Sequence, residues 1–249
     1  MGLTEFNMAL FIIAITAITI GALLKGMTGV GLPLIAVPAI ATFTSVEEAV
    51  VLMIIPTLGS NLWLVATHRR FAELLRAHLP FLVAGFLGGI IGTFILTTVD
   101  DRWLKLALAA WLALYLLQFA LGDFLQSLFQ AKGAAAVVGF CGGAIQGASG
   151  ISAHIVAPYF HGRKVAVRAY AFLVACAFLT FSAAQLVTAA GTQLFSAERL
   201  LLGCFALIPT LVFTRVGIRF AGKISQAAFQ KLLIALFVLM EIKLLADVF

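Results

Sequence analysis

The chain has 249 residues, of which 63% are hydrophobic and 10% are charged, and its mean hydropathy is +1.14. Soluble domains carry about 25% charged residues, so this composition excludes an ordinary soluble protein and indicates that much of the apolar surface faces lipid. The net charge of +6 does not indicate nucleic-acid binding, because the Lys and Arg residues lie in short connections between apolar runs. The runs lack the alternation of a β-barrel, so the sequence predicts an all-α membrane protein.

Apolar runs follow one another along the whole chain. They cover residues 6–24, 30–43, 46–66, 79–98, 103–121, 133–147, 150–160, 165–190, 199–217 and 226–246. The first run follows Glu5 rather than basic residues and has no cleavage site, so we interpret it as the first helix and not as a signal peptide. The runs 30–43 and 150–160 are too short to cross a bilayer alone, since a crossing takes about 20 residues.

The distribution of charge favours counting both short runs as crossings. With ten crossings, most basic residues, including Lys25 and Arg69, fall on one side, and most acidic residues, including Glu47 and Asp101, fall on the other. Without the short runs this bias largely disappears. The basic side is then cytoplasmic, which predicts a multi-pass protein of the cell inner membrane with both termini in the periplasm. Re-entrant hairpins with a different topology remain an alternative.

The segments before the two short runs resemble each other. We call residues 25–31 the first break and residues 146–152 the second break. At an offset of 121 residues, Gly26 corresponds to Gly147 and Thr28 to Ser149. A duplication with five crossings in each half must be inverted in the membrane, which is a common transporter design. We therefore predict two inverted five-segment repeats, 1–125 and 126–249, each with its first helix pair broken at a Gly-rich segment.

The Gly-rich segments Gly26–Pro33 and Gly139–Gly150 resemble the duplicated signature of the TauE/SafE permeases, the sulfite exporter family. The resemblance extends over essentially the whole chain, although Met27 and Thr28 stand where the family is richer in glycine. It implies a secondary transporter that exports small sulfur-containing anions, such as sulfite, sulfoacetate or other C2 sulfonates, by alternating access. An anion channel and an uptake permease for thiosulfate or carboxylates remain alternatives.

A helix that begins at membrane depth presents free N–H groups and a positive dipole end, which together favour an anion. If the repeats are inverted, the two short helices begin at one shared cavity. The alternative is that the glycines only allow close helix packing. The predicted substrate-binding residues are Thr28, Gly29, Val30, Gly31, Asn61, Gln146, Ser149, Gly150, Ile151, Ser152, His154 and Arg215.

Polar side chains within the spans have two interpretations each. Asn61 and Gln146 either bind substrate or hold helices together through hydrogen bonds, and for Gln185 we favour the second, structural interpretation. His154 either contacts the anion, carries a proton, or is a neutral histidine bonded to a carbonyl. Arg215 either grips a sulfonate or extends to the cytoplasmic surface.

Neither catalysis nor a cofactor is predicted. Cys141, Cys176 and Cys204 lie apart in apolar runs without metal or disulfide spacing. A P-loop is absent from the sequence. Ser149 lacks a suitable base, because His154 lies five residues later on the expected helix. We expect the partners to be the lipid bilayer and a small anion, and exposed apolar faces would permit a homodimer.

Overall fold

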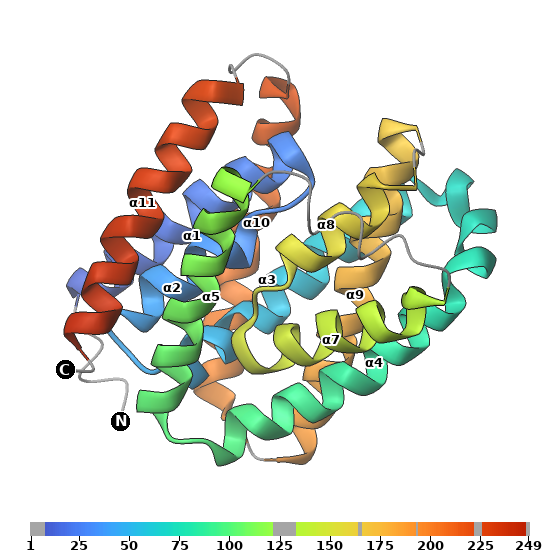
Figure 1. Ribbon diagram of the computed structural model, residues 1–249. Coiled ribbons are helices and arrows are strands. Elements are labelled where there is room, and N and C mark those ends of the chain that lie inside the picture. Colours follow the sequence, from blue (N-terminus) through green and yellow to red (C-terminus); the bar gives the residue numbers. More distant parts are fainter. Residues whose placement is uncertain (1–7, 122–132, 164–165, 193, 222–225, 248–249) are drawn as a thin grey trace.

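The computed structural model describes residues 8–121, 133–163, 166–192, 194–221 and 226–247, and all the regular secondary structure of these residues is helical (Figure 1). The first half contains α1 (Met8–Thr28), α2 (Leu32–Ala41), α3 (Val46–Thr67), the 3₁₀ helix η2 (Arg69–Leu74), α4 (Leu75–Thr98) and α5 (Asp101–Leu121). The second half contains α7 (Ala134–Ser149), α8 (Ala153–His161), α9 (Val167–Gly191), α10 (Ala197–Phe220) and α11 (Gln226–Ala246).

Several of these helices are suited to a lipid environment. Five described segments are long and apolar enough to cross a membrane: Leu10–Thr28, Val46–Thr67, Arg69–Thr98, Val167–Gly191 and Ala197–Phe220. Large apolar side chains such as Val83, Phe205 and Leu239 lie exposed on the outer faces. A soluble protein would not leave so many of them in water. The prediction of an all-helical membrane protein is therefore confirmed, whereas the number of crossings stays a prediction.

The helices of the two halves correspond in order and position. α1 ends at Thr28 and α7 ends at Ser149, while α3 begins at Val46 and α9 begins at Val167, which is the same offset of 121 residues in both cases. The main packing pairs correspond too: α1 packs on α10 and α7 on α4, α3 packs on α10 and α9 on α4, and α3 packs on α9. α5 and α11 lie side by side at one edge of the bundle (Figure 1).

Close backbone contact explains one glycine in each break. A Cβ on Gly26 would overlap the carbonyl oxygen of Thr214 in α10, and a Cβ on Gly147 would overlap the carbonyl oxygen of Gly89 in α4. Helices approach this closely only where small residues face each other. The packing interpretation therefore holds for Gly26 and Gly147, but Gly29 and Gly150 have a different role, described below.

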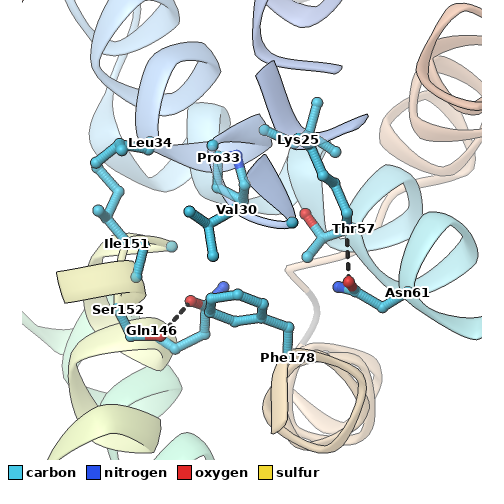
Figure 2. A pocket seen from close by; sticks show the side chains of 15 residues that line it. Lys25, Val30, Pro33, Leu34, Thr57, Asn61, Gln146, Ile151, Ser152 and Phe178 are labelled. Carbon is cyan, nitrogen blue, oxygen red and sulfur yellow. Dashed lines mark hydrogen bonds between the residues drawn. The ribbon is translucent and has the colours of Figure 1, made fainter. Parts of the chain in front are cut away.

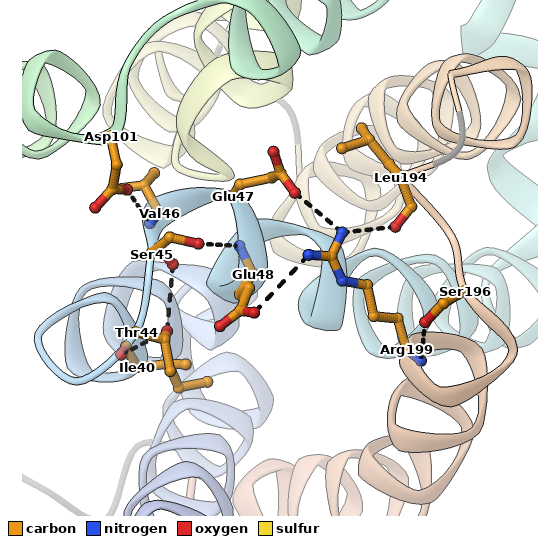
Figure 3. Close-up of polar contacts among 10 residues, drawn as sticks. All are labelled: Ile40, Thr44, Ser45, Val46, Glu47, Glu48, Asp101, Leu194, Ser196 and Arg199. Atoms are coloured by element: carbon orange, nitrogen blue, oxygen red, sulfur yellow. Dashed lines mark hydrogen bonds and ion pairs between the residues drawn. The ribbon is translucent and has the colours of Figure 1, made fainter. Parts of the chain in front are cut away.

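Polar residues gather at one end of the molecule, where α3, α5 and α10 begin (Figure 3). The Arg199 guanidinium lies 3.0 Å from a Glu47 carboxylate oxygen and 3.8 Å from one of Glu48. The backbone N–H of Val46 donates to Asp101 Oδ1 at 2.7 Å. Glu47 and Asp101 were both assigned to the acidic side from the sequence, and the structure places them at the same end of the molecule.

Candidate functional site

A cavity lies where the two breaks meet (Figure 2). Residues of both breaks line it, together with the first residues of α2 and α8, one face of α3, and Phe178 of α9. Many of the lining residues form pairs at the 121-residue offset: Lys25 with Gln146, Gly29 with Gly150, Val30 with Ile151, Gly31 with Ser152, Leu32 with Ala153, and Thr57 with Phe178. The two halves thus contribute corresponding positions to one space.

The first break ends α1 through a local set of hydrogen bonds. Gly29 has φ 84° and its N–H donates to the Lys25 carbonyl at 2.8 Å. The Thr28 hydroxyl donates to the Leu24 carbonyl at 2.9 Å and accepts from the N–H of Val30 at 3.3 Å. Glycine adopts this left-handed conformation without the penalty that a Cβ brings. The turn therefore depends on Gly29, and the Thr28 hydroxyl is engaged within it.

The second break repeats these contacts. Gly150 has φ 71° and its N–H donates to the Gln146 carbonyl at 2.7 Å. The Ser149 hydroxyl donates to the Ile145 carbonyl at 2.8 Å and accepts from the N–H of Ile151 at 3.3 Å. Ser149 therefore closes the end of α7 as Thr28 closes the end of α1, and neither residue lines the cavity.

Most of the residues predicted from the sequence lie around the cavity. The lining includes Gly29, Val30, Gly31, Asn61, Gln146, Gly150, Ile151 and Ser152, and does not include Thr28, Ser149, His154 or Arg215. The ring of His154 is buried, with its centroid 4.0 Å from that of Trp111, and its two nitrogens have no hydrogen-bond partner in the described part of the chain. Arg215 is exposed on α10. Neither of these two side chains therefore lines the cavity.

The model of the sulfite exporter TauE/SafE family matches residues 13–244, which span both breaks and every helix around the cavity. The chain belongs to this family. No curated protein and no solved structure matches it. TauE/SafE proteins are membrane transporters of the sulfite-exporter type, which is consistent with the expectation of a transporter rather than an enzyme. Within the described residues, no three His, Cys, Asp or Glu side chains are placed to hold a metal ion.

In this TauE/SafE protein, Lys25 does not lie where its sequence predicts. The ten-crossing prediction put it in a cytoplasmic connection, whereas the structure buries it at 3% exposure beside the cavity. The reason is that α1 continues to Thr28, past its predicted end at residue 24, so Lys25 lies in the last turn of the helix. Its ammonium donates to Ser60 Oγ at 2.9 Å and to Asn61 Oδ1 at 2.6 Å.

A polar face of α3 receives the Lys25 side chain. Thr57, Ser60 and Asn61 are spaced so that they share one face of the helix, and all three are buried. The Ser60 hydroxyl also donates to the Pro56 carbonyl one turn earlier in α3 at 2.7 Å, so it donates to the backbone while it accepts from Lys25. This spacing is visible in the sequence, and it is the signal that could have identified Thr57 as well as Asn61.

Neutral groups form the opposite wall of the cavity (Figure 2). The Ser152 hydroxyl donates to Gln146 Oε1 at 2.8 Å, and Gln185 Nε2 donates to the Gln146 carbonyl at 2.9 Å. Gln185 therefore links α9 to the end of α7, as expected from its structural interpretation. Phe178 stands where the first half has Thr57. The wall from the second half is thus neutral and partly apolar.

Proposed function

We propose that the protein exports small sulfur-containing anions, such as sulfite and C2 sulfonates including sulfoacetate, across the cell inner membrane by alternating access. The cavity between the two breaks is the substrate site. One observation carries this proposal: two broken helices from separate halves of a sulfite-exporter-family chain end at one buried cavity that corresponding residues line. Broken helices at the interface of two repeats are the usual place for the substrate in secondary transporters.

The directions of the helices support an inverted arrangement of the halves. α3 begins at the end of the molecule where Glu47 lies, and α4 begins only after α3 has run to Thr67. α10, the counterpart of α4, begins at the first end, because Arg199 near its start contacts Glu47. α4 and α10 therefore run in opposite directions. In such an arrangement one half can open the site to one side of the membrane and the other half to the opposite side.

The cavity is smaller than the proposed substrates. The space between the breaks is about that of one water molecule, which is too small for a sulfonate. Substrate therefore reaches the site only when the breaks move apart. The proposed topology has ten crossings, including α2 and α8, and places both termini in the periplasm. A homodimer stays a prediction.

Flux into liposomes tests the proposal. Purified protein is reconstituted, and uptake of radiolabelled sulfite, isethionate and sulfoacetate is measured with and without unlabelled anion inside. A carrier gives saturable flux that internal substrate accelerates, whereas a channel gives no acceleration. Absence of flux for every sulfur-containing anion would contradict the proposal.

A matched pair of variants links the flux to the cavity. Gly150→Ala places a Cβ at a residue with φ 71° in the cavity wall, 3.0 Å from Val37 Cγ2, and is expected to abolish most of the flux. Gly133→Ala places a Cβ at a residue with a similar backbone conformation, φ 85°, but there the Cβ meets no atom within 4 Å. Both substitutions strain the backbone at a positive φ. If Gly133→Ala keeps its flux and Gly150→Ala loses it, the loss is therefore specific to the second break.

A further inference from the structure

Unused hydrogen-bond donors gather on the first-half side of the cavity. Thr57 Oγ1 and Asn61 Nδ2 are buried and have no hydrogen-bond partner in the described part of the chain. A lysine ammonium has three donor hydrogens, and Lys25 Nζ uses two of them, on Ser60 and Asn61. All three groups belong to residues that line the cavity. Buried donors without partners are unfavourable, so their presence here points to a ligand that supplies acceptors.

Charge points to the same ligand. Lys25 is the one charged residue among those that line the cavity, and the ion pairs of the described residues do not include it. A buried charge without a counter-charge is strongly unfavourable. The hydrogen bonds to Ser60 and Asn61 solvate the ammonium but do not neutralise it. An anion beside Thr57 and Asn61 would neutralise it and would also accept from the unused donors.

We infer that Lys25, Thr57 and Asn61 form the cluster that holds the anionic group, and that the single positive charge makes the site select monovalent over divalent anions. This inference rests on the proposed function and narrows its substrate. The main contacts with the anion then come from three side chains of α1 and α3, and not from the backbone N–H groups of the breaks. Gln146 and Phe178 would face the rest of the substrate, and neither can neutralise a second negative charge.

Two ligands of nearly equal size test the charge selection. Isethionate and sulfoacetate both carry a sulfonate on a two-carbon chain, but isethionate ends in a hydroxyl and sulfoacetate in a carboxylate. Binding of each to the purified full-length protein is measured by titration calorimetry at pH 7.5. Isethionate is expected to bind at least about tenfold more tightly, because the carboxylate of sulfoacetate would be a second negative charge buried without a counter-charge. Equal or tighter binding of sulfoacetate would overturn the selection of monovalent anions.

Two substitutions test the cluster itself. Lys25→Gln keeps a hydrogen-bonding side chain but removes the charge, and it is expected to weaken isethionate binding by at least about tenfold. Thr57→Val keeps the shape of the side chain and removes a hydroxyl that has no partner in the described structure. We therefore expect Thr57→Val to melt at the same or a higher temperature than the wild type and yet to bind isethionate more weakly. A purely structural role for Thr57 would not separate these two readouts.

Thr93→Val is the matched control. Thr93 is also fully buried, but its hydroxyl donates to the Gly89 carbonyl at 2.8 Å and it does not line the cavity. This variant should keep the wild-type affinity for isethionate. If the wild type binds sulfur-containing anions and Thr57→Val and Lys25→Gln bind them equally well, the cluster is wrong while the proposed function stands. If the wild type binds none of them, the proposed function fails and the cluster fails with it.

Discussion

The two breaks share a backbone but differ in their side chains. Gly29 and Gly150 end their helices with the same left-handed conformation and the same hydrogen bond to the residue four positions earlier. At that earlier position the first half has Lys25 and the second half has Gln146. Where α3 contributes Thr57, α9 contributes Phe178. Corresponding backbone positions of the two halves therefore line the cavity, and we propose that the side chains that differ between the halves determine which substrate binds.

The largest expected effect is a loss of stability at the two glycines, one in each half, that lie against the backbone of a neighbouring helix. Gly26→Ala and Gly147→Ala each force a Cβ against backbone atoms of a neighbouring helix, α10 in one case and α4 in the other. Backbone cannot move aside as a side chain can, so we expect each to destabilise the protein near the upper end of the about 1–3 kcal/mol typical of overpacking. The loss is measured as a lower melting temperature in detergent.

Gly191→Ala is the control for this pair, because a Cβ there meets no atom within 4 Å. It should leave the melting temperature unchanged. If Gly26→Ala and Gly147→Ala differed greatly in their effect, the equivalence of the α1–α10 and α7–α4 contacts would be wrong.

The next largest expected effect is a change in ligand preference at the position where the first half has Lys25 and the second half has Gln146. Gln146→Lys places a second ammonium at the position that corresponds to Lys25, on the opposite wall of the cavity. A second positive charge compensates a second negative charge, so we expect the ratio of sulfoacetate to isethionate affinity to rise by about tenfold, or about 1.4 kcal/mol. Titration of both ligands into the same variant cancels any general loss of stability. An unchanged ratio would contradict the idea that charge balance sets the preference.

A smaller effect is expected for the hydroxyls of the breaks. Thr28→Val and Ser149→Ala each remove a hydrogen bond to a carbonyl and a longer one, at 3.3 Å, from an N–H. Because the second bond is long and weak, the cost is close to that of a single hydrogen bond, about 0.5–1.5 kcal/mol. Neither residue lines the cavity, so the affinity for isethionate should stay within about twofold of the wild type. Melting curves and calorimetry measure the two quantities separately. A strong loss of affinity without a loss of stability would restore these hydroxyls as ligands, as the sequence alone suggested.

Much of the architecture follows from patterns that are local in the sequence. The predicted run 226–246 coincides with α11, and the run 46–66 is one residue shorter than α3, because apolar length decides these helices. The two breaks were also predictable, since Gly29 directly precedes the short apolar run 30–43 and Gly150 begins the short run 150–160. Short-range composition is sufficient in each case, because membrane helices satisfy their own backbone groups.

The side chains of the site depend on less local information. A basic residue at the end of an apolar run is usually in a connection, so Lys25 was assigned to the surface, and only the four further residues of α1 bury it. The indole N–H of Trp111 donates to the Ile151 carbonyl at 2.8 Å, across 40 residues of sequence. No periodicity in either segment predicts such a contact, because it depends on how α5 lies against the second break.

The smallest effect is expected where the two halves meet outside the cavity. Arg199 of α10 bridges to Glu47 and Glu48 of α3, and its guanidinium also donates to the Leu194 carbonyl at 2.8 Å. The side chains of Arg199 and Glu47 are 30% and 32% exposed, so water and salt screen the pair and its contribution is about 0–1 kcal/mol. Arg199→Gln should therefore lower the melting temperature slightly at low salt and not measurably at high salt. Arg102→Gln, at an exposed position near the same end, is the control. A large, salt-independent loss in Arg199→Gln alone would mean that this contact, and not only the glycine-lined interfaces, holds the halves together.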